Sequence, residues 1–416
     1  MARIFLLAAL MVIALFCGCT AWDQPTPAAD NMSGDAATRP EEAAPARPNV
    51  TGTAVKKVVV EGNPLIPIRG LMFPPGDEYL ELAGEMGANY ICYGHWIVPD
   101  LNGNIVNTST GWGSTLEETR QRVRDLHARG FKVWLYVRTP LYPMTPGEDT
   151  SEFTFELNPG LFSGLSPEAR ERFLAALRPK IMEVAVMAEE EGVELFGPVA
   201  PDQLYLVLEP RSGGNFSYNW SNSLLDEVRG IYTGEISMKT DLNPDTSQNK
   251  KILDIADFTG WDWVSSDVFG SCDGFPGGEG QVDSYSEWRH IYTSLLGALE
   301  AGKAKSGAKG IIFGPELLGI DGSAHSIIMA ERGYSSPEKI SLEEWEEARA
   351  TAWDMLLNDT MGRIDGYFFW SWWPGCSLPD YEYVRESGGI NVTSRKSAGT
   401  QGTLPSETIR KYYSAA

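Results

Sequence analysis

Residues 115–139, TLEETRQRVRDLHARGFKVWLYVRT, hold one full copy of the pattern on which the fold depends. The first part has apolar residues at helical spacing and ends at Gly130, which can take the left-handed position after a helix. A near-continuous apolar run from Lys132 to Thr139 follows, as expected for a strand covered on both faces. This stretch therefore predicts a helix followed by a strand of a parallel sheet.

The same alternation recurs along the chain beyond residue 55. Eight strands are predicted at Ile68–Phe73, Asn89–Ile97, Lys132–Thr139, Leu204–Glu209, Ile231–Met238, Asp262–Phe269, Gly310–Phe313 and Gly366–Trp372. Eight helices are predicted at Asp77–Gly87, Thr115–Gly130, Pro167–Gly192, Ser221–Gly230, Ser247–Phe258, Ser284–Gly302, Ser341–Asn358 and Ser406–Tyr413.

Eight such units predict an α/β fold of the (β/α)8 TIM barrel type. Val58–Val60 and Leu65–Ile66, separated by turn residues, predict an N-terminal hairpin in front of the barrel. A doubly wound open sheet is the alternative, but no Gly-rich phosphate loop follows the first strand.

The N-terminus has the features of an exported protein. Arg3 precedes an apolar run from Ile4 to Phe16, too short to span a bilayer comfortably and typical of a signal peptide. We expect residues 1–18 to be cleaved. The sequence Phe16-Cys17-Gly18-Cys19 resembles a prokaryotic lipobox, which would make Cys19 the lipidated N-terminus; an ordinary secretory signal is the alternative. We expect residues 19–54 to form a flexible tether and residues 55–416 to form the barrel.

Composition narrows the possible partners and the location. Lys and Arg number 34 against 56 Asp and Glu, a formal charge of −22, which argues against nucleic-acid binding. Seven Asn-x-Ser/Thr sequons among fifteen Asn suggest a glycoprotein, and together with the lipobox would suit an archaeal cell surface. We expect a monomer held at the membrane by its lipid anchor.

Two glutamates stand at predicted strand ends. Glu209 closes the apolar run Leu204–Glu209, and Pro210 keeps it extended. Glu316 follows the run Gly310–Phe313, after Pro315. Because the active site of a (β/α)8 barrel lies at the carboxyl ends of its strands, both glutamates are expected at one mouth.

A (β/α)8 barrel with acidic residues at the ends of strands 4 and 7 resembles the clan of retaining glycoside hydrolases, which includes cellulases, β-mannanases and β-galactosidases. The endo-β-mannanase type is the most similar. The resemblance covers roughly residues 58–413 and includes the motifs Ile68-Arg69-Gly70, Trp261-Asp262-Trp263-Val264, Asp267-Val268-Phe269 and Gly366-Tyr367-Phe368-Phe369-Trp370-Ser371-Trp372-Trp373.

The resemblance implies a reaction and its residues. Glu209 would be the general acid/base and Glu316 the nucleophile of a double displacement on a neutral β-linked glycan, with no metal or cofactor. Two positions depart from the clan. Leu208 stands where an Asn usually precedes the acid/base, and Phe269 stands where a Tyr often orients the nucleophile. A non-catalytic, glycan-binding barrel at the cell surface is therefore the alternative.

Substrate contacts are expected from polar and aromatic residues at or just beyond strand ends: His95, Trp96, Arg138, Asp267, Trp370 and Trp372. For His95 and Arg138, an ion pair or hydrogen bond that holds a neighbouring loop is an equal alternative. Trp261 and Trp263 begin the sixth strand and are expected in the core or barrel floor. Cys92 is expected as a small core residue, and pairing of Cys272 with Cys376 stays open.

Overall fold

The computed structural model describes residues 57–59, 61–72, 77–97, 99, 102–105, 115–139, 165–200, 216–240, 257–269, 284–316, 323–335, 340–369 and 403–414. All of them belong to the compact unit Ala54–Ala416. The predicted signal peptide, Cys19 and the tether lie outside the described residues, as do Cys272, Cys376, Glu209, Trp370 and Trp372.

Eight parallel strands close into a barrel, which confirms the predicted (β/α)8 fold. Each strand pairs with the next, and the β1–β8 pairing, with Gly70 beside Phe368, completes the circle. In chain order the strands are β1 (Ile68–Met72), β2 (Tyr90–Trp96), β3 (Lys132–Arg138), β4 (Leu195–Gly197), β5 (Glu235–Thr240), β6 (Trp263–Phe269), β7 (Gly310–Glu316) and β8 (Gly366–Phe369).

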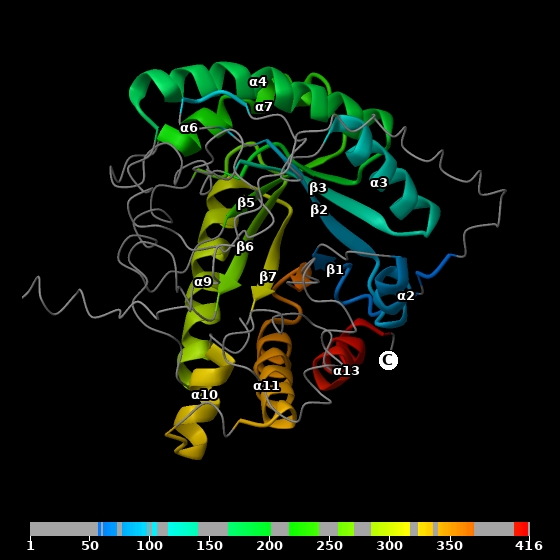
Figure 1. Ribbon diagram of the computed structural model, residues 1–416, viewed down its shortest axis with the longest axis vertical. Coiled ribbons are helices and arrows are strands. Elements are labelled where there is room, and N and C mark those ends of the chain that lie inside the picture. Colours follow the sequence, from blue (N-terminus) through cyan, green and yellow to red (C-terminus); the bar gives the residue numbers. More distant parts are fainter. Residues whose placement is uncertain are drawn as a thin grey trace, which may run out of the picture. The chain divides into compact units, whose positions relative to one another are not determined.

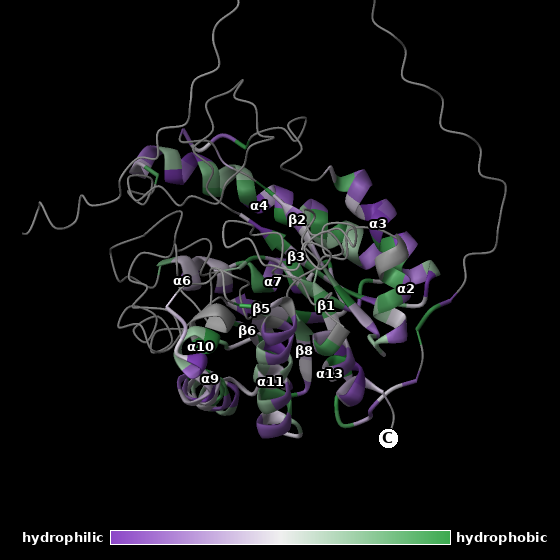
Figure 2. Cartoon of the chain, turned by 60° about the horizontal axis from the view of Figure 1, so that its bottom comes forward, coloured by the Kyte–Doolittle hydropathy of each residue, from purple (hydrophilic) through white to green (hydrophobic). Residues whose placement is uncertain are grey.

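Helices surround the barrel (Figure 1) and carry both hydrophobic and hydrophilic residues (Figure 2). Their bounds are α2 (Asp77–Glu85), α3 (Leu116–Ala128), α4 (Pro167–Glu190), α6 (Phe216–Asn222), α7 (Leu225–Arg229), α9 (Tyr285–Ser306), α10 (Ser323–Arg332), α11 (Leu342–Thr360) and α13 (Thr403–Tyr413). Helix α10 was not predicted. The predicted helix Ser247–Phe258 lies almost wholly outside the described residues, and Asp257 and Phe258 are not helical.

Local sequence signals explain where several helices begin and end. Ser341 and Glu344 form the predicted capping box of α11, in which each side chain bonds the other residue's backbone. Gly130 has the predicted left-handed backbone, with φ 93°. Gly302 does not end α9 as predicted. The helix continues to Ser306, and Gly307 takes the left-handed position with φ 75°.

Two strands lie elsewhere than predicted. The fourth barrel strand is Leu195–Gly197, which pairs with both β3 and β5, whereas the predicted strand Leu204–Glu209 lies outside the described residues. It begins so soon after α4 and is so short that it lacks a recognisable apolar run. The fifth strand is Glu235–Thr240, not Ile231–Met238, because Tyr232 still bonds the last turn of α7 through Val228.

The predicted N-terminal hairpin is wrong. A turn is present, since the Ile66 amide donates to the Asn63 carbonyl over 3.1 Å. The flanking residues pair elsewhere: the Val58 amide donates to Arg129, and Gly62 bridges antiparallel to Ser414. This segment bonds backbone groups at the end of α3 and just after α13, and these neighbours satisfy polar groups that a hairpin would otherwise pair.

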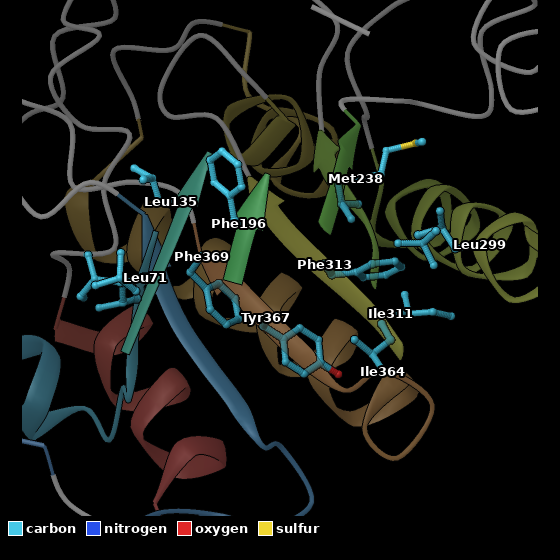
Figure 3. Close-up of a cluster of buried hydrophobic side chains, with 14 of the residues drawn as sticks. Leu71, Leu135, Phe196, Met238, Leu299, Ile311, Phe313, Ile364, Tyr367 and Phe369 are labelled. Carbon is cyan, nitrogen blue, oxygen red and sulfur yellow. The ribbon is translucent and has the colours of Figure 1, made fainter. Parts of the chain in front are cut away.

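The core has two layers, separated by the strands. Alternate residues face the helices, including Leu71, Phe196, Phe313 and Tyr367 in the cluster of Figure 3. The other residues face inward and fill the barrel with a separate cluster of Ile68, Met72, Tyr90, Cys92, Trp134, Tyr136, Leu195, Ile312 and Phe368. The barrel is thus a packed core and not a pore.

A four-fold repeat of side-chain hydrogen bonds closes the barrel floor. In each copy, the residue before an even-numbered strand accepts a bond from the backbone amide of the second residue of the preceding strand. The acceptor and donor pairs are Asn89 and Arg69 (2.8 Å), Glu194 and Val133 (2.8 Å), Asp262 and Ile236 (2.8 Å), and Asp365 and Ile311 (2.9 Å). Strands are thereby joined in pairs where their ladders begin.

In the described part of the chain, none of the helices has the length and apolar character needed to cross a membrane.

Removing one of these floor acceptors should destabilise the barrel. Asp365→Ala leaves the Ile311 amide without its acceptor, so we expect a loss of about 1–3 kcal/mol in the free energy of unfolding, measured by urea denaturation. Asp365→Asn keeps an acceptor oxygen and should lose less. The control is Glu183→Ala, which breaks an exposed ion pair with Lys180 and should cost under about 1 kcal/mol. Equal losses for Asp365→Ala and Glu183→Ala would contradict the proposed role.

Candidate active site

The carboxyl ends of the eight strands lie at one face of the barrel, because all strands are parallel. Each segment that leaves this face connects a strand to the next helix. The segment after β4, which leads to α6, contains Glu209, and the segment after β8, which leads to α13, contains Trp370 and Trp372. These three residues therefore belong to connections that leave the carboxyl-terminal face of the barrel, and their own placement lies outside the described residues.

Glu316 is the last residue of β7, in register with Phe269 at the end of β6. Gly314 and Ile312 precede it at two-residue intervals, and Ile312 belongs to the interior cluster. Because strand residues alternate between two faces, Glu316 occupies an interior position of the strand at the mouth of the barrel.

Trp96 and Arg138 lie together at the same mouth. They pair in register as the last residues of β2 and β3, and both are half-buried. The Arg138 guanidinium carbon lies 4.8 Å from the Trp96 ring centroid, a cation–π contact that holds both side chains. The same guanidinium lies 5.7 Å from the ring of Tyr136, one inward position earlier on β3.

Asp267 is buried in an ion pair with Lys239. Lys239 is 1% exposed and Asp267 5%, so both charges are withdrawn from water. They come from neighbouring strands: Lys239 is the fifth residue of β5, and Asp267 the fifth of β6. The Lys239 ammonium also lies 5.4 Å from the centroid of the Tyr136 ring. Hence Asp267 has a cationic partner that the sequence analysis did not identify.

Lys239 was missed because the predicted fifth strand began four residues too early and ended two residues too early, at Met238. The sequence signal that could have found Lys239 is the alternation of strand residues between the helix-facing layer and the barrel interior. Ile236 and Met238 are buried in the helix-facing layer, which leaves Ser237 and Lys239 for the barrel interior. A lysine at an interior strand position requires a partner because an unpaired buried charge is costly.

Two further titratable groups lie beside this pair. Burial raises the pKa of the Tyr136 hydroxyl and also raises the pKa of the Cys92 thiol, so both are protonated at neutral pH. Cys92 is buried and free, which confirms its expected place in the core. Trp263 contacts the interior cluster, and Trp261 is buried, as predicted for core or floor residues.

His95 lies apart from the other candidates. Its Nδ1 is 2.8 Å from the Thr119 Oγ1 of α3, so the ring occupies the layer between β2 and that helix. Trp96, the next residue along the strand, is on the opposite, interior face. Desolvation lowers the pKa of His95 to about 4, which keeps the ring neutral. The alternative considered for His95 was an ion pair or hydrogen bond to a neighbouring loop; the structure shows a hydrogen bond to Thr119 of helix α3.

Among the described residues, no group of three or more His, Cys, Asp and Glu side chains could hold a metal ion.

No protein-family model matches the sequence, and no curated protein matches it. Among solved structures, the fold is similar to a GH113 β-1,4-mannanase, with TM-score 0.54 and 14% identity over 84% of this chain and 99% of the other. A complex of a GH113 β-1,4-mannanase has TM-score 0.52 and 14% identity, covering 85% and 99%. A GH113 β-mannanase from Alicyclobacillus acidocaldarius has TM-score 0.49 and 15% identity, covering 86% and 99%. At these identities the likeness shows that the barrel fold is shared.

The buried neutral His95 should make the protein sensitive to acid. The unfolded chain protonates this ring near its ordinary pKa of 6.5, whereas the folded protein does so only near 4, so stability falls as the pH drops through that window. Urea denaturation at pH 7.5 and 4.5 should show that His95→Gln loses about 2–3 kcal/mol less than the wild type between these pH values.

The control for this measurement is His290→Gln, which changes an exposed histidine of α9. It should lose as much stability as the wild type on acidification. If His95→Gln behaves in the same way as His290→Gln, His95 is not the group responsible.

Proposed function

We propose that this protein is a retaining glycoside hydrolase that cleaves a neutral β-linked glycan. The observation that carries the proposal is the position of Glu316 as the last residue of β7 in a closed parallel barrel. A carboxylate there lies at the face where barrel enzymes place their reacting groups. Two solved structures with TM-scores above 0.5 to this fold are β-1,4-mannanases, which makes β-mannan the first substrate to examine.

The proposed reaction needs two carboxyl groups with different roles. Glu316 attacks the anomeric carbon and forms a glycosyl ester, while Glu209 protonates the departing glycosidic oxygen. Glu209 then takes a proton from water as the water oxygen bonds the anomeric carbon. The ester bond from that carbon to Glu316 breaks, Glu316 leaves as a carboxylate, and the original anomeric configuration is restored. The groups must lie about 5–5.5 Å apart. The β4–α6 connection contains Glu209, so the topology supports this pairing even though β4 itself ends at Gly197.

The mouth also suits a sugar ring. Trp96 offers an aromatic surface whose position is fixed by Arg138, and pyranose rings present C–H faces that pack on such surfaces. The formal charge of −22 would repel a polyanion from the protein, which favours a neutral glycan. Trp370 and Trp372, in the β8–α13 connection, are proposed as further stacking residues.

A glycan-binding protein without hydrolase activity is the second candidate, and one observation favours it. Phe269 pairs in register with Glu316 at the ends of β6 and β7. Phenylalanine has no hydroxyl, so this position cannot donate a hydrogen bond to a nucleophilic carboxylate. In that case the chain would bind glycans through the same mouth without cleaving them.

Hydrolysis separates the two candidates. Wild-type protein should release reducing sugar from β-mannan, and Glu316→Gln should lower kcat by at least about 1,000-fold because the amide is not a nucleophile. Glu209→Ala should be similarly slow on glycosides with poor leaving groups and should form a β-glycosyl azide when azide is added. Glu407→Gln, an exposed change on α13, serves as the control and should keep full activity. Binding of mannan without turnover by the wild type would support the second candidate.

We also propose that the protein is exported and anchored at the cell surface through lipidated Cys19, with residues 19–54 as the tether. The basis is the sequence Phe16-Cys17-Gly18-Cys19 and the preceding apolar run. Asn219 and Asn358, two of the seven sequon asparagines, lie exposed on α6 and α11, where a glycan could be carried.

The anchor can be tested by fractionation. In cells that process lipoproteins, the wild type should sediment with membranes, and Cys19→Ser should move to the soluble fraction because it cannot accept the lipid. Cys17→Ser is the matched control, since that residue should be removed with the signal peptide. Membrane association of Cys19→Ser at the wild-type level would refute the anchor.

A further inference from the structure

We propose that Lys239 and Asp267 form a charge-compensated pair that sets the charge around Glu316. The inference rests on the function proposed above, because it treats Glu316 as the nucleophile, and it adds two residues that act on that site through their charges. The pair lies inside the barrel, on β5 and β6, one interior position below the end of β7.

The pair is part of a polar stripe inside an otherwise apolar barrel. Ser237 and Ser265, the interior residues that precede Lys239 and Asp267, have their hydroxyl oxygens 3.3 Å apart. The two strands therefore make side-chain contacts in successive layers. A buried ion pair is a poor source of stability because desolvation of two charges offsets their attraction. Its location at the catalytic face instead suggests a role in the reaction.

Asp267 reaches across to β7. It pairs in register with Gly314, and a Cβ atom at residue 314 would overlap the Asp267 Oδ1. Glycine at position 314 thus leaves the space that the carboxylate occupies. Glu316 follows Gly314 by two residues on the same face, a spacing of roughly 7 Å along a strand. The Asp267 carboxylate therefore lies directly below the position of Glu316.

Lys239 makes this arrangement compatible with an ionised nucleophile. A lone Asp267 charge would repel the negative charge of Glu316, whereas the paired Asp267 adds little net charge. The other titratable groups that face this point are Tyr136 and Arg138 of β3 and Cys92 of β2. Tyr136 and Cys92 are protonated, since burial raises the pKa of each. The interior residues Met72 of β1 and Phe368 of β8 carry no charge.

Changing one member of the pair should shift the titration of Glu316 in a direction set by the charge that remains. Lys239→Met leaves a negative charge below Glu316 and should move its titration to higher pH by about one to two units. Asp267→Asn leaves a positive charge and should move it to lower pH by a similar amount. The double variant Lys239→Met/Asp267→Asn removes both charges and should return the titration close to that of the wild type.

The experiment is a ¹³C NMR titration of side-chain carboxyl groups, with the Glu316 signal identified by its loss in Glu316→Gln. It requires no turnover, so it remains decisive if the proposed hydrolysis fails, and that failure is recognised separately by the absence of glycan cleavage. In an active protein, the acidic limb of the kcat/KM profile should move with the titration. Glu407→Gln, an exposed change on α13, should leave both unchanged.

Breaking a buried pair can prevent folding, so circular dichroism of each variant is recorded first. If Lys239→Met does not fold, Asp267→Asn and the double variant decide the outcome. The Glu316 titration should move to lower pH in Asp267→Asn and should stay close to that of the wild type in the double variant. Shifts in opposite directions for the two single variants, cancelled in the double variant, support the proposal. A Glu316 titration that stays constant, or that moves the same way in all variants, overturns it.

Discussion

Closure of eight parallel strands into one hydrogen-bonded circle is the constraint on which the rest of this structure depends. Pairing of β8 with β1 closes the circle of strands, and because every pairing is parallel, all the carboxyl ends lie at the same face. The floor is reinforced by the four acceptors Asn89, Glu194, Asp262 and Asp365, one for each pair of strands. This repeat indicates that the barrel is built from four similar two-strand units, each fastened at its base.

The interior changes character from floor to mouth. Near the middle, the rings of Trp134 and Phe368 pack with centroids 4.6 Å apart, and both side chains are buried. Toward the carboxyl ends, Lys239 and Asp267 replace apolar side chains, and Arg138 stacks on Trp96. A closely packed middle layer supports a rigid scaffold, and the buried charges above it act in a medium where electrostatic effects are stronger than in water. This gradient would hold the reacting groups of the proposed hydrolase in fixed positions.

The sequence predicted the fold well because periodicity is a local property. Residues 115–139 have a capping residue, a helical period, a terminal glycine and an apolar strand, and the structure has α3 and β3 there. Leu195–Gly197 could not be predicted in the same way, because three residues show no period and only pairing with β3 and β5 makes them a strand. Side-chain partners depend on distant segments. Lys239 was missed because the predicted fifth strand ended before it. His95 was assigned to the mouth together with Trp96, although consecutive strand residues lie on opposite faces.

The central claim is that Glu316 forms a covalent bond to a sugar during turnover. The most direct measurement is to incubate the protein with an activated 2-deoxy-2-fluoro-β-mannoside, which slows hydrolysis of a glycosyl ester, and to map the modified peptide by mass spectrometry. The account predicts one fluoromannosyl group on Glu316 and none on the Glu316→Gln variant. Turnover of mannan that leaves every carboxylate unlabelled and inverts the anomeric configuration would contradict it.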